Sequence, residues 1–290
     1  MSKIKSAATA IAMAAAIGSP LAASAQSAGK VLVVLSSEHQ LTLKDGKTYQ
    51  SGYFLNELAV PLSKLIEAGY TPVFADPKGN EPVMDKNSND KTFFGGNEEA
   101  RLTSLKLVQA QAGLKAPKKL VDVAHEGISQ YVGVFIPGGH APMEDLMKDR
   151  NLGKVLTAFH SAGKPTGVIC HGSAVILAAA ANPEALHEAA VSNDKAAVAK
   201  HAKGWPYHGY KVSAFATEEE KQVEGPGKQL DGYMTVYAED ALVLAGATVQ
   251  NGPAWQPNVV EDRELVSGQQ PFSAEAFGDR FVAKLKASVK

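Results

Sequence analysis

The sequence predicts an α/β fold in which a doubly wound, mostly parallel sheet is sandwiched between helices. Short aliphatic and β-branched runs recur along the 290 residues, and longer segments with helical spacing lie between them. The composition, 45% hydrophobic and 20% charged, is that of a globular chain that can bury one large core. Because the runs are mostly apolar on successive residues, we expect strands buried on both faces, as in parallel sheets.

The first residues have the pattern of a secretory signal peptide. Residues 1–5 are basic, residues 7–21 are apolar but short and alanine-rich, and residues 23–25 form a small-x-small cleavage signal. We therefore expect residues 1–25 to be removed and residues 26–290 to form a single domain with insertions. The expected location is periplasmic or secreted, with no membrane association after cleavage.

The predicted elements alternate in the order that this fold requires. Strands are expected at residues 31–35, 71–75, 131–136, 166–169 and 211–215. Helices are expected at residues 52–68, 148–162, 173–181, 237–245 and 274–286. A hairpin is expected at residues 258–266, turning at Asp262-Arg263.

Two polar segments do not fit the alternation and are interpreted as insertions. Residues 80–126 contain loops around a helical piece at 98–112, and residues 187–209 are rich in alanine, lysine and histidine. We expect both to cap the carboxyl edge of the sheet. Trp205 and Trp255 are expected to pack the cap and the C-terminal loop.

Charge and cysteine content narrow the function classes. The formal net charge is −1 and no block of lysine and arginine stands out, so nucleic acid is not an indicated partner. The single cysteine rules out an internal disulfide and a cysteine zinc cage. The histidines outside the motifs below have no zinc-site spacing, so neither a metal nor a cofactor is indicated; they are His39, His125, His160, His187, His201 and His208.

Cys170 is the first candidate for chemistry. It lies where an apolar run ends and an alanine-rich helical run begins, a corner that exposes a nucleophile beside free backbone N–H groups. Those groups lower a thiol pKa and can hold an oxyanion. A lone cysteine is more often a small buried hydrophobe. The adjacent His171, the flanking glycines and the expected export favour a reactive thiol.

Glu57 is the second candidate. It borders the apolar stripe of the first predicted helix, where burial would raise the pKa of a carboxyl and let it share a proton with a thiolate. The alternative is a glutamate that the helix dipole favours in a first turn.

The third candidate is Gly138-Gly139-His140, directly after a predicted strand. Paired glycines let the backbone approach a ligand, and their amides could bind a carbonyl oxygen. The alternative is a tight strand-to-helix connection without a binding role.

Together these motifs resemble the DJ-1/PfpI (ThiJ/PfpI) superfamily, and within it the glyoxalase III branch that includes heat-inducible chaperones. The most specific phrases are residues 52–57 and 169–172, supported by residues 255–257 and 267–271. The resemblance covers residues 30–286. It implies a flavodoxin-like fold, like that of class I glutamine amidotransferases.

The resemblance also implies residue roles. Cys170 matches the nucleophile, His171 its neighbouring histidine and Glu57 the acid at the thiol. The loop of Gly138, Gly139 and His140, with the amide of His171, matches the site for the substrate oxygen. A further acid that orients His171 is implied among Glu218, Glu219 and Glu220, of which Glu220 fits the spacing best.

The implied activity is conversion of methylglyoxal or glyoxal to a hydroxy acid without glutathione, cofactor or metal (D-lactate dehydratase), with deglycation of proteins as a related activity. The implied partners are a small dicarbonyl or a glycated protein, and a second copy of the chain in a homodimer.

Three other interpretations of the function stay open. A class I glutamine amidotransferase also uses an elbow cysteine, but no His-x-Glu phrase follows Cys170. A cysteine peptidase or amidase of the PfpI type is possible by resemblance. The non-enzymatic alternative is a holdase chaperone or a thiol oxidation sensor.

Overall fold

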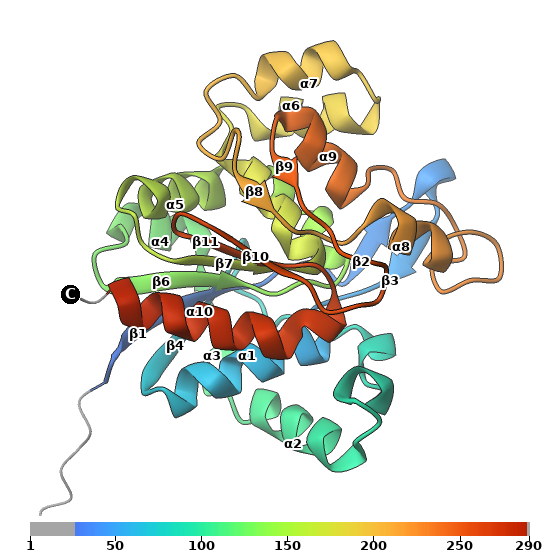
Figure 1. Ribbon diagram of the computed structural model, residues 1–290. Helices are drawn as coiled ribbons and strands as arrows, with labels where there is room; N and C mark the ends of the chain where they lie inside the picture. The colour runs from blue at the N-terminus through green and yellow to red at the C-terminus, as the bar shows by residue number, and fades with distance from the viewer. Residues whose placement is uncertain (1–26, 289–290) are drawn as a thin grey trace, which may run out of the picture.

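A seven-stranded sheet forms the centre of the molecule (Figure 1). The computed structural model describes residues 27–288, so the predicted signal peptide and its cleavage site lie outside the described residues. The strand order is β10-β11-β7-β6-β1-β4-β5, and every neighbouring pair is parallel except β10 with β11. The strands are β1 (Gly29–Val34), β4 (Tyr70–Asp76), β5 (Lys118–Lys119), β6 (Tyr131–Ile136), β7 (Thr166–Ile169), β10 (Val259–Asp262) and β11 (Leu265–Gly268). The predicted fold class is confirmed.

Helices cover both faces of this sheet and bury two separate cores. On one face α1 (Leu55–Glu67) packs against α10 (Ala274–Ser288); on the other lie α4 (Leu120–Glu126), α5 (Arg150–Ser161) and the 3-10 helix η6 (Cys170–Ala179). Successive β1 residues serve the two cores in turn, because side chains alternate across a strand. Val31 and Val33 belong to the α1/α10 core, and Leu32 and Val34 to the α5/η6 core.

The first predicted helix starts three residues later than expected. Tyr53 is held in extended conformation because its N–H donates to the carbonyl of Val83 and its carbonyl accepts from Asp85 N–H, both at 2.9 Å. The helix α1 therefore begins at Leu55.

The strand expected at residues 211–215 is wrong in extent and place. Only β8 (Lys211–Val212) forms, and it pairs with β9 (Thr248–Val249) in a separate two-stranded sheet. Beyond it the backbone is held by side chains instead of a strand ladder: Ser213 N–H donates to Ser267 Oγ and Ala214 N–H to Asn251 Oδ1.

The place beside β7 is taken by the predicted C-terminal hairpin. Its second strand, β11, pairs with β7 in parallel, and β10 forms the edge. The hairpin turns at Arg263-Glu264, one residue later than expected, with Arg263 at φ 53°.

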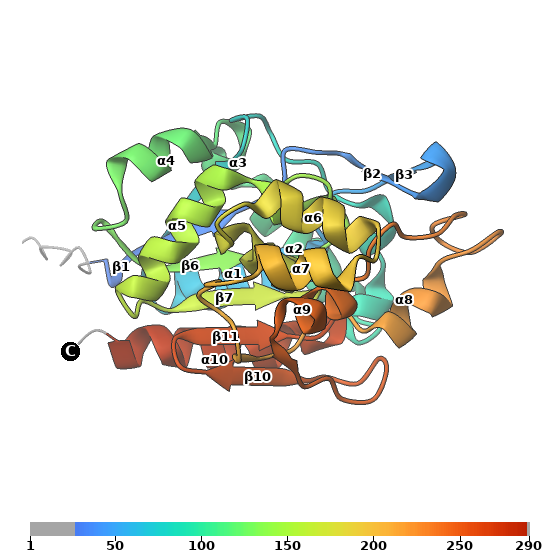
Figure 2. The same ribbon diagram turned by 90° about the horizontal axis from the view of Figure 1, so that it is seen from above.

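The two predicted insertions lie in different places. Residues 80–126 supply η2 (Lys86–Ser88), η3 (Lys91–Phe94), α2 (Glu98–Gln109), α3 (Ala112–Lys115), β5 and α4. Residues 187–209 complete α6 (Pro183–Val191) and form α7 (Lys195–His201), which pack over η6 and α9 (Ala238–Ala245) on the sheet face seen in Figure 2. Trp205 is buried there and donates to the carbonyl of Ile176.

The remaining elements are short. They are β2 (Gln40–Thr42), η1 (Lys44–Gly46), β3 (Thr48–Gln50), η4 (Ala141–Met143), η5 (Leu146–Lys148), α8 (Thr217–Val223) and η7 (Pro271–Ser273). No helix within residues 27–288 has the length and apolarity to cross a bilayer.

Candidate active site

Cys170 lies at the carboxyl end of β7, where the chain turns sharply into η6. Its backbone has φ 61°, a left-handed conformation that costs a non-glycine residue free energy and is typical of nucleophile elbows. A residue from another segment holds this turn, because the Cys170 carbonyl accepts a hydrogen bond from Phe215 N–H. The thiol therefore has a defined direction above the sheet edge.

A chain of hydrogen bonds connects this thiol to a buried carboxylate. Cys170 Sγ is 3.3 Å from His171 Nδ1, and His171 Nε2 is 2.5 Å from Glu220 Oε2. His171 and Glu220 are almost fully buried. Since Nε2 faces a carboxylate, it carries the ring proton, and Nδ1 is left as the acceptor that faces the thiol.

Of the three neighbouring glutamates, only Glu220 reaches the histidine. Glu218 is exposed at the start of α8. Glu219 points the other way and accepts from the backbone N–H groups of Ala216 and Trp255. A helix turns its side chains by about 100° per residue, which separates the three carboxylates.

Glu220 is shared by a second histidine. His140 Nε2 lies 2.9 Å from Glu220 Oε1, and the rings of His140 and His171 are 4.1 Å apart. Burial lowers the pKa of His140, but the charge of Glu220 outweighs it and the net shift is upward. Burial and the neighbouring His140 lower the pKa of His171 to about 4. Although burial alone would raise it, the two histidines hold the pKa of Glu220 well below its usual range. At neutral pH His171 is therefore a neutral base.

Glu57 reaches the thiol from the opposite side, on the first turn of α1. It is wholly buried, and neither of its oxygens has a well-formed hydrogen-bond partner among the described residues. Burial raises its pKa to about 8, against the influence of the Cys170 thiol and the backbone of Gly138 and Gly139. Glu57 thus keeps its proton at neutral pH.

The glycine pair after β6 is required by close approach. A Cβ on Gly138 would collide with the Glu57 carboxyl and come within 2.6 Å of Cys170 Cβ. Gly139 has φ 93° and packs against the backbone of Gly52. The N–H groups of Gly139 and His171 both face the sulfur, a position suited to hold an oxyanion.

The expectation that the pKa of the Cys170 thiol is lowered is wrong in its net direction. Helix and loop N–H groups do lower the pKa of the Cys170 thiol, but burial and the Glu57 carboxyl outweigh them and raise it well above its usual value. Cys170 is 2% exposed. The thiol consequently needs a base at the moment of reaction, and His171 is placed to be one.

A mostly apolar pocket of about 370 Å³ opens over the thiol. It is lined by Phe54, Phe93, Gly139, His140, Cys170, His171, Phe215, Val223, Gln229, Trp255, Pro271 and Phe272. The sequence analysis does not predict the aromatic members as pocket residues, and it places Trp255 in the packing of the C-terminal loop. They come from five separate segments, and no spacing rule connects them.

One cluster in the described part of the chain has donor atoms arranged as metal ligands could be. The atoms of His140, His171 and Glu220 lie within 4.8 Å of one another. Both Glu220 oxygens already bond to a histidine ring, so this carboxylate is engaged in a hydrogen-bonded relay, while His140 Nδ1 has no partner among the described residues. Its members come from three distant segments, which is why histidine spacing did not reveal it.

Comparison with known proteins decides the family. Residues 49–226 match the model of the ThiJ/PfpI family-like group. The chain belongs to the DJ-1/PfpI superfamily. A relative from Staphylococcus aureus, protein/nucleic acid deglycase HchA, is 25% identical over 264 residues, which are 90% of this chain and 81% of that protein.

Solved structures support the same fold. Glyoxalase III from Candida albicans is 22% identical with a TM-score of 0.60, and covers 89% of this chain and 97% of its own. The Rapid Encystment Protein 24 KDa from Francisella tularensis is 23% identical with a TM-score of 0.63, and covers 89% and 99%. A third structure, 28% identical over 90% of this chain, has a TM-score of 0.67. These likenesses agree with the flavodoxin-like fold that the sequence implied.

Proposed function

We propose that this protein converts methylglyoxal or glyoxal to the corresponding hydroxy acid without glutathione, with Cys170 as nucleophile. The observation that carries the proposal is that the thiol lies between the buried Glu57 carboxyl and His171 Nδ1, which is 3.3 Å from the sulfur. A dicarbonyl must lose a proton from one carbon and gain one on the next, and this site holds an acid and a base around a single sulfur.

The first step forms a hemithioacetal. Cys170 Sγ attacks the aldehyde carbon while the thiol proton passes to His171 Nδ1. The carbonyl electron pair moves to oxygen beside the N–H groups of Gly139 and His171, and Glu57 then protonates it.

The second step moves hydrogen between the carbons. The Glu57 carboxylate removes the proton from the former aldehyde carbon, and protonated His171 supplies a proton to the second oxygen, giving an enediol. Glu57 returns its proton to the second carbon while the first oxygen gives its proton to His171, which leaves a thioester. Water then adds to the thioester carbon, the C–S bond breaks, and the protons on water and His171 restore the thiol and Glu57. The net reaction is dicarbonyl plus water to hydroxy acid.

The test is lactate formation from methylglyoxal by residues 26–290, without glutathione. Wild type is compared with Cys170→Ala and Glu57→Gln, and both variants should lose at least about a thousandfold in kcat/KM. Turnover that survives in Cys170→Ala would end the proposal. Absence of turnover in a wild type whose thiol is reduced would favour a peptidase, a chaperone or a thiol sensor.

Protein deglycation is the second part of the proposal. It is supported by the deglycase relatives, and it would use the same thiol on the aldehyde-derived carbon of an early adduct. The homodimer stays a prediction, which light scattering of the purified protein tests.

We further propose that the protein acts outside the cytoplasm. The support is the signal-peptide pattern of residues 1–25. N-terminal sequencing of protein recovered from a periplasmic fraction should give Gln26 as the first residue; an intact Met1 would contradict export.

A further inference from the structure

The pocket over Cys170 is larger than a small dicarbonyl requires. Its volume is about 370 Å³, and pockets of roughly 300–1,000 Å³ usually hold ligands of drug size. Methylglyoxal has three carbons, so it would leave most of this space empty. The lining beyond the thiol therefore bears on which substituent the substrate carries beside its two carbonyl groups.

The lining offers little to a charged or sugar-like substituent. No lysine, arginine, aspartate or glutamate of the described residues lines the pocket. His140 could carry a positive charge, but its Nε2 is already paired with Glu220 at 2.9 Å. Gln229 is the one amide side chain that the described residues contribute, and its Nε2 donates to the hydroxyl of Tyr49. A phosphate or a chain of hydroxyl groups would therefore lose more hydrogen bonds to water than it regains here.

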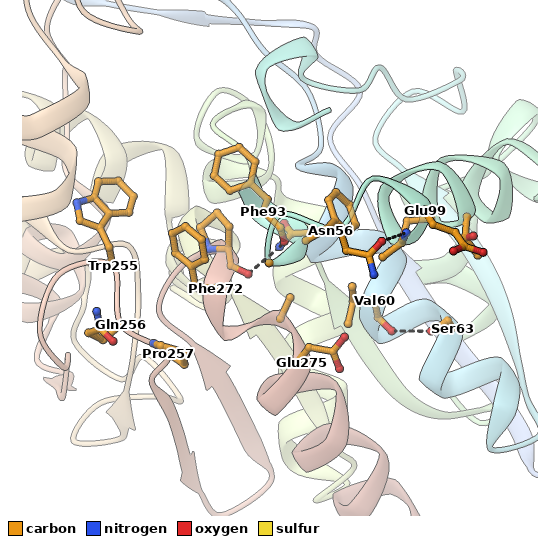
Figure 3. A pocket seen from close by; sticks show the side chains of 18 residues that line it. Asn56, Val60, Ser63, Phe93, Glu99, Trp255, Gln256, Pro257, Phe272 and Glu275 are labelled. Carbon is orange, nitrogen blue, oxygen red and sulfur yellow. Dashed lines mark hydrogen bonds between the residues drawn. The ribbon is translucent and has the colours of Figure 1, made fainter. Parts of the chain in front are cut away.

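Aromatic rings form most of the remaining wall. Phe215 stacks on His171 with ring centres 4.4 Å apart. Phe54 and Phe93 meet edge to face at 4.7 Å, and Phe93 lies 5.9 Å from Phe272 (Figure 3). Phe93 and Phe272 are only half-buried, and both also border the cavity drawn in Figure 3, which has about 840 Å³ and lies between α1, α2 and the start of α10. The pocket thus keeps apolar ring surface that a ligand can cover.

Trp255 stands in this wall on a strained backbone. Its φ is 60°, a left-handed conformation that is unfavourable for a bulky residue and is typical of functional positions. Its N–H donates to Glu219 Oε1 at 2.6 Å, and its indole Nε1–H donates to Gln222 Oε1 at 2.8 Å. Both acceptors belong to α8, the helix that also carries Glu220. The indole is therefore held in place by the same element that orients His171.

We propose that this wall selects α-oxoaldehydes with an aromatic substituent, such as phenylglyoxal, whose ring lies among Phe93, Trp255 and Phe272 while its aldehyde meets the thiol. The inference rests on the proposed function and names its substrate class. Offset and edge-to-face ring pairs gain more than apolar area alone provides, and a methyl group can form none. The reaction is unchanged, since phenylglyoxal plus water gives mandelate as methylglyoxal plus water gives lactate.

The experiment measures mandelate from phenylglyoxal and lactate from methylglyoxal in wild type and in variants of the wall. In wild type, kcat/KM for phenylglyoxal should be at least about tenfold the higher. The ratio of the two values should fall about tenfold in Trp255→Asn and about threefold in Phe272→Leu. Asparagine tolerates a left-handed backbone, so the first variant removes the indole without adding strain.

Tyr233→Ala is the matched control. It removes an aromatic ring that is 47% exposed and does not line the pocket, so the ratio should stay that of wild type. The variants are compared by this ratio because the two aldehydes differ in intrinsic reactivity. A wild type that prefers methylglyoxal, or a ratio that neither Trp255→Asn nor Phe272→Leu changes, would overturn the inference.

Binding of two ketones without an aldehyde separates this question from the chemistry. The probes are acetophenone and acetone, and the readout is saturation-transfer NMR with the wild type and Trp255→Asn. Transfer to acetophenone and not to acetone, weakened in the variant, supports the aromatic wall even if neither aldehyde is turned over. Equal transfer to both ketones, or none to acetophenone, contradicts it.

Discussion

Among residues 27–288, two buried glutamates, Glu220 and Glu264, bond to histidine rings, and only Glu220 has the surroundings of an active site. At the carboxyl end of β7, His171 contacts Glu220. At the opposite end of the same strand, His160 Nδ1 lies 2.9 Å from Glu264 Oε1, and the Glu264 carbonyl accepts from Thr166 N–H. Both glutamates are buried, so the pairing alone does not distinguish them.

The two sites differ in the further groups that the histidine and the glutamate contact. The Tyr210 hydroxyl donates to the second carboxylate and lies 3.1 Å from each of its oxygens, and the Tyr210 ring is covered by the Arg263 guanidinium at 3.3 Å. That pair has no thiol or other nucleophile beside it, although Glu264 borders a cavity of about 350 Å³. The first pair ends on a thiol in a strained elbow and opens into an apolar pocket. A buried His–carboxylate pair thus becomes reactive only where a nucleophile completes it.

Of the changes that test this comparison, substitution of the two glutamates should have the largest effect. Glu220→Gln removes the charge that orients His171, and we expect kcat/KM for methylglyoxal to fall at least about a hundredfold. Glu264→Gln is the matched control and should stay within about twofold of wild type. Steady-state kinetics on both variants measures these effects. Equal losses in the two variants would show that Glu264 is not merely structural.

The next expected effect is on stability. Glu57, which lies beside Cys170, should make the free energy of unfolding depend on pH. Its pKa is about 8 in the folded protein against an ordinary value of 4.5, so the folded state holds a proton that the unfolded state releases. This contribution to the free energy of unfolding is fully present below pH 4.5 and is lost as the pH rises to about 8. The loss is about 1.4 kcal/mol per pH unit at most.

Urea unfolding of wild type and Glu57→Gln measures that loss. Between pH 5.5 and 7.5 the difference in stability between the two proteins should change by up to about 3 kcal/mol in favour of the glutamine variant. A difference that is constant with pH would mean that Glu57 does not hold its proton.

The sequence predicted the local parts of this architecture better than the distant ones. The elbow at Cys170 could be seen because a strand run and a helical run meet within a few residues. Glu220 could only be ranked among three glutamates, since the choice depends on which face of α8 meets His171. The pairing of β11 with β7 depends on how the sheet packs, and the hairpin pattern does not predict it.

For a related reason the sequence does not predict the cavity between α1, α2 and α10, or the contact that His140 makes with Glu220. Asn56, Phe93 and Phe272 lie far apart in sequence and meet only through tertiary packing. His140 was expected in a backbone site for the substrate oxygen, and its bond to Glu220 depends on a residue eighty positions away. Burial likewise reversed the net shift expected for the thiol.

The smallest expected effect tests the structural pair directly. Tyr210→Phe removes the hydroxyl that donates to Glu264, at 3.1 Å to each oxygen, while keeping the ring under Arg263. A lost hydrogen bond to a buried carboxylate should lower the free energy of unfolding by about 1.5 kcal/mol. Because Tyr210 lies at the end of the sheet away from Cys170, kcat and KM for methylglyoxal should not change. Thermal or urea unfolding together with kinetics checks both halves, and a loss of activity at unchanged stability would show that the two ends of β7 are coupled.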